Sequence, residues 1–511
     1  MHFPDSRLTP GREKGNVRCV TDTQGRAAGR ESSGTLEERP PADRGRARLQ
    51  PGPAGRRFRH VLCVYPYRSE IGPAGRFYPP LGLEIVAAAL KPYCQSIDVI
   101  DLRWESKRTR DFIRPDTDLV CFSVNWSFEP ESVREEIRSV PPEILTIVGG
   151  RHASEDPERW LADCPNVDMV VRGPGEVAIE EIALGRPPGE IAGVSYRLDG
   201  HLAHAPARRS DSIPDRFGPD RRLRRYSYTV DQPDFHTGLK FDTLASSVGC
   251  PYNCAFCSFS RNPWGVKRQW SARTPEAVVE ELAGIDADLV AFVDDIFTYD
   301  MDRVSAICDL ILSRGIRKKY IVNARIELAR RPDVVRKMER AGFSLLLIGI
   351  ESAQDKTLRS MRKGFDTRRL RELFRSLRAT RMILHGYFIV GNIGESESEM
   401  LQIAPFARDL GLDSLSLCLL RNEAYSGIEE IVADTPGYHI APDRGVYSDA
   451  YPQERLREIR NRIYREFYTA RQLARLAGKL LRRRLLTPRI ILQLPSLMWS
   501  ALLGRFNPVP G

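Results

Sequence analysis

Three cysteines fall within eight residues of the stretch GCPYNCAFCSF, residues 249–259. Cys250, Cys254 and Cys257 offer thiolates, the ligands that structural zinc and iron–sulfur clusters take. A structural zinc site needs four ligands, usually in two spaced pairs, and no second pair follows here. A ferredoxin-type cluster also takes four thiolates, at a different spacing. A third interpretation is a 4Fe–4S cluster held by three thiolates, with one iron left open for another ligand.

Two distant cysteines could supply a fourth thiolate. Cys308 lies among apolar neighbours in a predicted helix, and Cys418 lies inside a predicted strand, so both are typical of a packed core. The three-ligand cluster is therefore favoured. An open iron permits a reaction at the metal, as the open position of catalytic zinc does.

The segments around these cysteines alternate between strand and helix patterns. Short β-branched runs bounded by Gly or Pro predict buried strands, and amphipathic stretches such as 79–91 and 275–284 predict helices. Such alternation is typical of right-handed βαβ units and parallel sheets. The predicted strands are 59–67, 96–102, 118–124 and 144–150, and then 243–249, 289–295, 320–325, 345–352, 384–391 and 414–420.

The two sets of strands predict an α/β protein with a doubly wound, Rossmann-like domain followed by a partial (β/α)6 barrel of the TIM type. The cysteine trio directly follows the first barrel strand, which places it at the catalytic rim. The predicted segments are a disordered basic stretch 1–56, the first domain 57–205, a linker 206–240, the barrel 241–425 and a helical extension 426–511.

The spacing CxxxCxφC after that strand, with Phe256 as the aromatic φ, resembles the radical S-adenosylmethionine superfamily. The resemblance implies that S-adenosylmethionine binds the open iron. Electron transfer from the cluster then cleaves it to a 5′-deoxyadenosyl radical. Later strand ends resemble the family in the same order, although LLRNEAYSGIEEI after the sixth strand lacks the Pro-Gly-Thr turn of many relatives. The resemblance implies that S-adenosylmethionine contacts come from Phe256, Asp294, Asp295, Arg325, Glu351, Ser352, Gly391 and Glu395.

The upstream domain resembles the cobalamin-binding domain of one radical S-adenosylmethionine subgroup. IVGGRHASEDP (147–157) matches the subgroup's glycine pair and following His, and VVRGPGE (170–176) matches its strand-to-turn segment, with Pro174 as a departure. YPYRSEIGPAG (65–75) lacks the His that other cobalamin proteins place on cobalt; His152 is a substitute ligand or a residue that stabilises the glycine turn. The implied cobalamin contacts are Ser123, Asn125, Gly149, Gly150, His152, Gly173 and Glu176.

Charge is unevenly distributed along the chain. Of the net +10, residues 1–59 carry +6 and residues 455–511 carry +11, which leaves −7 for the region between them. General nucleic-acid binding by the central region is therefore not expected, because it needs a clustered basic face. Scattered cysteines and the lack of an apolar leader favour the cytoplasm. For the apolar, basic tail (489–506), either contact with a membrane surface or packing on the barrel is expected.

The resemblance implies an enzyme with a 4Fe–4S cluster, S-adenosylmethionine and cobalamin, supplied with electrons by a donor such as flavodoxin or ferredoxin. Cobalamin-dependent methylation of an unactivated carbon in a small-molecule or lipid substrate, as in hopanoid-type methylases, is favoured. The alternative is an oxidative cyclisation like that of the anaerobic magnesium-protoporphyrin monomethyl ester cyclase. A hypothesis from another class is a non-catalytic zinc protein or cobalamin sensor.

Overall fold

The computed structural model describes residues 57–68, 77–127, 130–198, 200–208, 212–232 and 235–485. The predicted disordered segment 1–56 and the apolar tail 489–506 lie outside the described residues. Two seven-stranded sheets organise the described chain. We refer to them as the first sheet and the second sheet.

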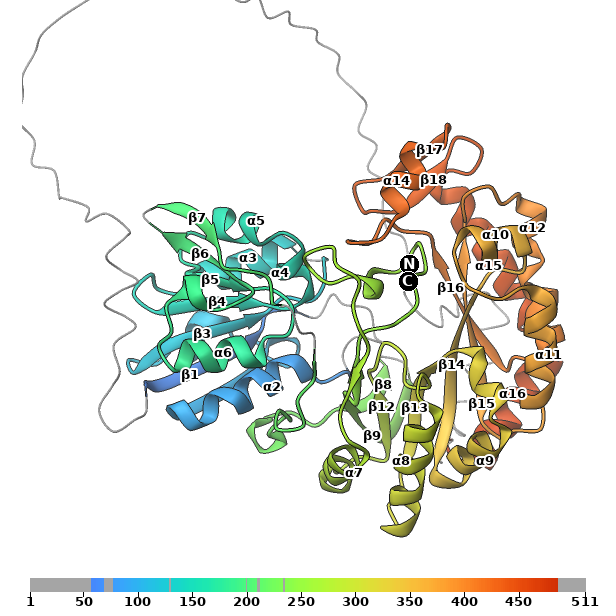
Figure 1. Ribbon diagram of the computed structural model, residues 1–511, viewed down its shortest axis with the longest axis horizontal. Helices are drawn as coiled ribbons and strands as arrows, with labels where there is room; N and C mark the ends of the chain where they lie inside the picture. Colours follow the sequence, from blue (N-terminus) through green and yellow to red (C-terminus); the bar gives the residue numbers. More distant parts are fainter. Residues whose placement is uncertain are drawn as a thin grey trace, which may run out of the picture. The chain divides into compact units, whose positions relative to one another are not determined.

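The first sheet has the order β2-β1-β3-β4-β5-β6-β7 (Figure 1). Strands β1 to β5 are parallel, and a β6–β7 hairpin adds an antiparallel edge. Helices α2, α3, α4 and α5 lie between the parallel strands, and α6 lies between β5 and the antiparallel β6. The strands are Phe58–Tyr65 (β1), Cys94–Asp101 (β2), Thr117–Ser123 (β3), Leu145–Gly149 (β4), Met169–Val171 (β5), Val194–Leu198 (β6) and His201–His204 (β7). The helices are Leu81–Leu90 (α2), Pro130–Arg138 (α3), Arg151–Glu155 (α4), Pro157–Asp163 (α5) and Glu176–Ala183 (α6).

This strand order places a topological switch point between β1 and β3. The chain runs from β1 outward to β2 and then returns to β3 on the other side of β1. In open α/β sheets, ligands bind at the carboxyl ends of the strands beside such a switch. The first sheet therefore has the predicted doubly wound architecture, and its carboxyl edge is the place to examine for a ligand site.

The second sheet has the order β16-β15-β14-β13-β12-β9-β8, with six parallel strands from β9 to β16. Its remaining strand, β8, pairs antiparallel with β9 and comes from residues predicted to be linker. The strands are Thr229–Gln232 (β8), Phe235–Leu244 (β9), Leu289–Phe292 (β12), Lys319–Ala324 (β13), Phe343–Glu351 (β14), Ile383–Val390 (β15) and Ser414–Leu419 (β16). The helices along this half are Pro275–Gly284 (α7), Met301–Ser313 (α8), Pro332–Ala341 (α9), Asp355–Ser360 (α10), Thr367–Leu377 (α11), Glu397–Leu401 (α12) and Ile403–Leu410 (α13).

The two faces of the second sheet differ in burial. Val290, Val322 and Leu346 lie on the face that packs into the main hydrophobic core, and all three are fully buried. Side chains point alternately to opposite faces of a strand, so Leu345 and Leu347 lie on the other, inner face, where they are only partly buried. The second sheet is thus a partial barrel whose inner face is not packed like a closed core.

The C-terminal extension covers the free edge of the second sheet. Helix α15 (Gln453–Phe467) places the Tyr464 hydroxyl where it accepts the backbone N–H of Leu417 at 2.9 Å. The hydroxyl of Tyr468 both accepts the N–H of Leu415 and donates to its carbonyl, each at 3.2 Å. These bonds satisfy backbone groups of the edge strand β16, which would otherwise be available to pair with another chain.

A polar network lies on the inner face where β15 pairs with β16. The two ring nitrogens of His385 lie 2.8 Å from the Ser414 hydroxyl and 3.0 Å from the Ser416 hydroxyl. Burial disfavours the charged imidazolium and lowers the pKa of His385 from 6.5 to about 4. His385 is therefore neutral near pH 7.

This histidine is expected to make the protein less stable in mild acid. Because its folded-state pKa lies below the unfolded value, its stabilising contribution is complete above about pH 6.5 and is lost as the pH falls toward 4. The loss at pH 4.5 is roughly 2–3 kcal/mol. Urea unfolding at pH 7.5 and pH 4.5 measures it, and His385→Gln should reduce the difference between the two pH values by that amount. An unchanged difference in the variant would contradict the assignment.

Candidate functional site

The cysteine loop begins after a short strand that the sequence does not separate from the one before it. Residues 243–249 were predicted as one strand, but β9 ends at Leu244 and a second strand, β10 (Ser247–Val248), pairs antiparallel with β11 (Ser271–Ala272). The break occurs at Ser246 and Ser247, whose hydroxyls bond to a buried carboxylate of the neighbouring strand end instead of continuing the sheet. The loop that carries the three cysteines therefore starts from a small, separately fixed ribbon.

Backbone contacts fix the cysteine loop on both sides. Gly249 has φ +81°, and a Cβ at this position would lie 2.2 Å from the carbonyl oxygen of Gln269, so only glycine fits. The Gly249 N–H donates to Asp295 at 2.8 Å. Farther along, the Ala255 N–H donates to the Met361 carbonyl, and the Ala255 carbonyl accepts the N–H of Gly427. The loop is positioned by segments from several distant parts of the sequence.

The three thiols have different exposure. Cys254 is buried, whereas Cys250 and Cys257 are partly exposed. Burial raises the pKa of Cys250 above its usual value and raises that of Cys257 to about 12. Within the described chain, no three His, Cys, Asp or Glu side chains are grouped as ligands of a single metal ion. The fit of the loop to an iron–sulfur cluster rests on its three thiols and on the partial exposure of two of them.

Two cations lie against the cysteine loop. The Arg325 guanidinium lies 3.7 Å from the centre of the Tyr252 ring, and its Nη1 lies 4.0 Å from the Sγ atom of Cys254. The ammonium of Lys363 lies 5.7 Å from the centre of the Phe256 ring. Arg325 also donates to the Lys363 carbonyl at 2.6 Å. Two cations therefore lie beside the thiols, and each is also paired with a carboxylate, Arg325 with Glu327 and Lys363 with Glu351.

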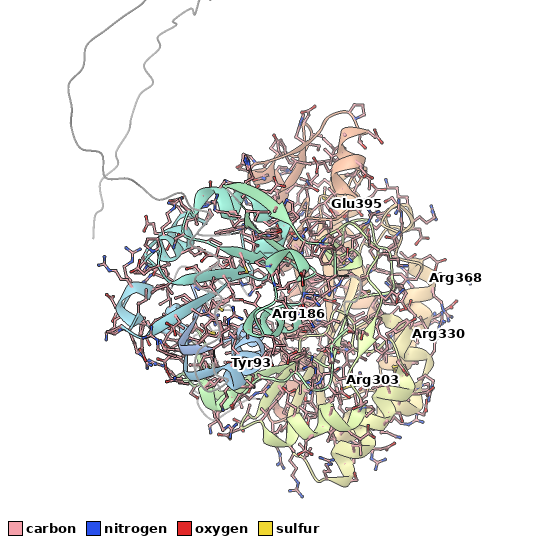
Figure 2. The ribbon with its side chains drawn as sticks, turned by 60° about the vertical axis from the view of Figure 1, so that its left-hand side comes forward. Tyr93, Arg186, Arg303, Arg330, Arg368 and Glu395 are labelled. Carbon is pink, nitrogen blue, oxygen red and sulfur yellow. The ribbon has the colours of Figure 1, made fainter. Side chains whose placement is uncertain are left out.

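The adjacent carboxylates Asp294 and Asp295 have distinct surroundings. Asp294 is fully buried and accepts the N–H and hydroxyl of Ser246 and the hydroxyl of Ser247, at 2.5–2.7 Å. Burial raises the pKa of both carboxyls. Arg303 of α8, labelled in Figure 2, donates to the Ser246 carbonyl and fixes the same turn. Asp294 thus positions the chain that enters the loop, and Asp295 contacts the loop itself.

The predicted pair at the end of β14 is split between two networks. Glu351 has φ +76° at a register irregularity in the strand, and its carboxylate accepts a bond from Lys363 at 3.2 Å. Ser352 instead donates to Glu395 at 2.5 Å, and Asn392 donates to the other oxygen of Glu395. Burial raises the pKa of Glu395; this residue is labelled in Figure 2. Gly391 directly follows β15, so the predicted strand-end residues do gather at one edge of the second sheet.

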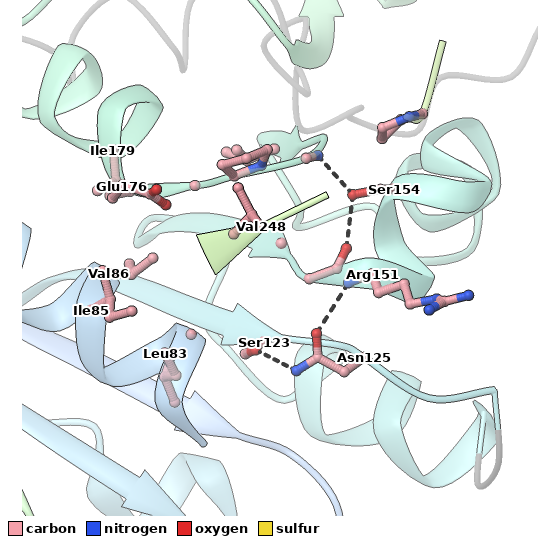
Figure 3. A pocket seen from close by; sticks show the side chains of 18 of the residues that line it. Leu83, Ile85, Val86, Ser123, Asn125, Arg151, Ser154, Glu176, Ile179 and Val248 are labelled. Atoms are coloured by element: carbon pink, nitrogen blue, oxygen red, sulfur yellow. Dashed lines mark hydrogen bonds between the residues drawn. The ribbon is translucent and has the colours of Figure 1, made fainter. Parts of the chain in front are cut away.

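A pocket of about 380 Å³ lies at the carboxyl edge of the first sheet (Figure 3). Strand ends, the turns after them and helix α2 form its walls. Six of the seven predicted cobalamin contacts line it: Ser123, Asn125, Gly149, Gly150, Gly173 and Glu176.

The turn after β4 requires glycine at position 150. Gly150 has φ +102°, and a Cβ would lie 2.6 Å from the Val124 carbonyl oxygen. The Asn125 side chain joins this turn to β3, since it donates to the Ser123 hydroxyl and accepts the Arg151 N–H (Figure 3). A side chain larger than that of glycine would therefore disturb the turn that forms part of the pocket wall.

The seventh predicted contact, His152, is not among the residues that line the pocket. Its Nδ1 lies 3.3 Å from Glu155, and its ring packs edge-on against Trp160. The backbone N–H of His152 donates to the Val124 carbonyl. Its place in the structure matches the second of its two predicted roles, the stabilisation of the glycine turn.

The pocket also reaches residues on both sides of the cysteine loop. Val248 precedes the loop by one residue, Ser258 follows Cys257 directly, and both line the pocket. Arg151 of α4 bonds to the Ser258 hydroxyl, and Tyr425 donates to the Ser154 carbonyl at 2.9 Å. Helix α4 thus joins the pocket to the loop.

Several of these residues were missed by the sequence reasoning. Lys363 and Tyr425 belong to no motif, and no periodicity marks them as special; Tyr252 lies within the cysteine motif, at a position that the cysteine spacing leaves open. Tyr252 could have been predicted from the sequence, because an aromatic residue inside a metal loop can bind a cation with its ring. Lys363 and Tyr425 reach the site only through folding, from segments about 100 and 170 residues after the cysteines.

Comparisons with known proteins follow the same two-part organisation. The family model of the Radical SAM superfamily matches residues 244–407, and that of the B12 binding domain matches residues 71–183. An uncharacterized methyltransferase of Pyrococcus horikoshii is 27% identical over 376 residues, covering 69% of this chain and 78% of the relative. The hopanoid C-3 methylase of Methylococcus capsulatus is 30% identical over 324 residues. The matched region makes up 59% of this chain and 59% of the relative.

A third relative is the anaerobic magnesium-protoporphyrin IX monomethyl ester cyclase of Rubrivivax gelatinosus, 22% identical over 73% of this chain and 70% of the relative. Among solved structures, the radical S-adenosylmethionine methyltransferase TsrM from Kitasatospora setae matches with a TM-score of 0.60 at 17% identity. That match covers 84% of this chain and 89% of TsrM. This match shows a likeness of fold. Together with the cysteine loop and the glycine-lined pocket, these matches establish that the chain belongs to the radical SAM superfamily, as an enzyme whose barrel follows an N-terminal B12 binding domain.

Proposed function

We propose that this protein is a cobalamin-dependent radical SAM methyltransferase that methylates an unactivated carbon of a small-molecule or lipid substrate. The observation that carries the proposal is the pocket of the first sheet, whose lining includes Val248 and Ser258 on either side of the cysteine loop. A methyl donor bound in this pocket would lie next to a radical generated at the loop. That proximity is what a transfer between two cofactors requires.

The residues divide into two binding sets. The 4Fe–4S cluster would be held by Cys250, Cys254 and Cys257. Cobalamin would bind in the pocket that the glycine turns at 149–150 and 173 line. When bound, the cluster and S-adenosylmethionine supply the radical, and cobalamin supplies the methyl group. Each turnover would take two electrons from a donor outside the chain, such as flavodoxin or ferredoxin: one to cleave S-adenosylmethionine and one to restore the form of cobalamin that accepts a methyl group.

The strand-end residues would orient S-adenosylmethionine. The Asp295 carboxylate suits the methionyl ammonium, and it is held in place by the Gly249 N–H. Positive charge at Arg325 and Lys363 suits the methionyl carboxylate. Ser352 and Glu395, buried and bonded to each other, keep the strand ends beside the adenosyl group in fixed geometry.

Relatives support methyl transfer and also supply the rival reaction. Two of the three relatives described above have names that state methylation, and one of these acts on a hopanoid, a lipid. The third is a cyclase, which makes a radical-initiated oxidative cyclisation the second candidate. The hypothesis of a zinc protein without catalysis has no support from these relatives.

Product analysis distinguishes these candidates. The full chain, reconstituted anaerobically with iron, sulfide and cobalamin, is incubated with S-adenosylmethionine and a chemical reductant. Methyl transfer predicts both 5′-deoxyadenosine and S-adenosylhomocysteine, because one molecule of S-adenosylmethionine is cleaved and another donates its methyl group. 5′-Deoxyadenosine without S-adenosylhomocysteine would favour the cyclase type of reaction, and the absence of 5′-deoxyadenosine would refute both.

A further inference from the structure

Helix α16 (Ala470–Arg482) is attached to the second sheet by its polar side chains. Gln472 donates to the carbonyls of Leu412 and Asp413, at 2.6 and 3.0 Å. Lys479 donates to the Met382 carbonyl at 3.0 Å and pairs with Asp413 at 2.6 Å. Among the residues of this helix, Gln472 alone is buried. An amphipathic surface helix normally buries its apolar stripe instead.

The apolar stripe of α16 therefore lies outside the hydrophobic cores. Leu473, Leu476 and Leu480 are only partly buried, and Leu481 is 52% exposed. None of these four leucines belongs to the hydrophobic clusters formed by the described residues. Their spacing at three, four and one residues places them along one side of the helix. We call these four leucines the leucine stripe.

The charge around the leucine stripe has a single sign. Residues 470–485 contain six Lys or Arg and no Asp or Glu, and the sequence has no acidic residue from 467 to 511. Arg471, Arg482 and Arg484 are exposed, and none of them forms an ion pair with an acidic residue of the described chain. A helix with leucines along one side and unpaired arginines on the opposite side is typical of helices that lie in a membrane interface.

We propose that α16 binds the surface of an anionic lipid membrane, with the leucine stripe in the interface and Arg471 and Arg482 at the lipid headgroups. The charge selects this partner, because a second copy of the chain would bring the same basic helix face to face with itself. The described residues contain no helix long and apolar enough to cross a membrane.

The carbonyls that α16 caps define where the membrane would contact the protein. Met382 precedes β15, Asp413 precedes β16, and Phe343, whose carbonyl accepts a bond from Arg483, begins β14. All three lie at the amino ends of their strands, whereas the cysteine loop lies at the carboxyl ends. Membrane contact through α16 therefore leaves the catalytic end of the barrel uncovered.

Vesicle sedimentation of the full chain tests the proposal. Binding is expected to phosphatidylcholine vesicles that contain about one third phosphatidylglycerol, with weaker binding to phosphatidylcholine alone and at high salt. The double variant Arg471→Glu, Arg482→Glu should lower the partition coefficient at least about tenfold, because each basic residue contributes about fivefold at such a surface. The matched control, Arg330→Glu with Arg359→Glu, reverses two exposed charges that follow the carboxyl ends of β13 and β14, and it should bind like the unmodified protein.

A second variant measures how much the leucine stripe contributes to vesicle binding, independently of charge. Leu476→Gln with Leu480→Gln retains every charge and should also weaken binding, with an unchanged circular dichroism spectrum showing that the helix persists. Equal binding by both variants and the unmodified protein would overturn the assignment to α16. A loss of dimer mass in the leucine variant, measured by sedimentation equilibrium without vesicles, would also overturn it, since the stripe would then serve a second copy.

Discussion

Replacing any one of Cys250, Cys254 or Cys257 by alanine is expected to reduce the iron and sulfide of the anaerobically reconstituted protein to background and to abolish 5′-deoxyadenosine formation. The reason is the ligand count. The loop supplies only three thiols, and Cys308 and Cys418 lie in a helix and a strand distant from it in the sequence. A cluster with one open iron cannot lose another thiolate without becoming labile.

The control for this experiment is another cysteine. Cys308 is fully buried in the core beneath α8, and burial raises its thiol pKa to about 12. Cys308→Ala should cost about 1 kcal/mol of stability through the small cavity that it leaves, and it should keep its iron. Iron analysis, the visible absorbance of the cluster and electron paramagnetic resonance compare the four variants. Retention of a full cluster by any alanine variant of the loop would refute the assignment of that cysteine.

The second large effect is expected from filling the pocket of the first sheet. Gly82 lies in the first turn of α2 and lines this pocket, and a Cβ there meets nothing within 4 Å. Tryptophan at this position should therefore project into the pocket without strain in the helix. We expect Gly82→Trp to retain cobalamin at least about tenfold more weakly, equivalent to about 1.4 kcal/mol. Folding stability should rise slightly, because glycine is a poor residue in a helix.

Opposite effects on binding and stability make this result specific. Gly284 ends α7 and is exposed, and a Cβ added to it would likewise meet nothing within 4 Å, so Gly284→Trp is the matched control. Equilibrium dialysis with cobalamin and thermal unfolding measure the two quantities. If Gly82→Trp binds cobalamin as well as the control does, the cofactor does not occupy this pocket. If it simply unfolds, Gly82→Leu repeats the test with a smaller side chain.

Much of the architecture could be predicted from local sequence patterns. β-Branched runs separated by amphipathic stretches predicted both parallel sheets, and α7 has the predicted bounds, 275–284. Thr274 caps α7 with its side chain, and Gly342 in a left-handed conformation ends α9. Such end signals are local and can be read from a single sequence. The break of 243–249 into β9 and β10 was not predicted, because it depends on Asp294, a residue of a different strand end.

The residues of the candidate site were likewise predictable only in part. Spacing alone identified the three cysteines, since a loop ligand set is contiguous in the chain. The resemblance of two glycine turns and a strand end to a cobalamin-binding domain identified six residues of the pocket. Sequence could not place Lys363 beside Phe256, exclude His152 from the pocket lining or put Val248 and Ser258 on its wall. It also could not show that α16 turns Gln472 inward and leucines outward. These features depend on contacts between residues far apart in the chain, which are determined by the packing of whole elements and not by the local preferences of the backbone.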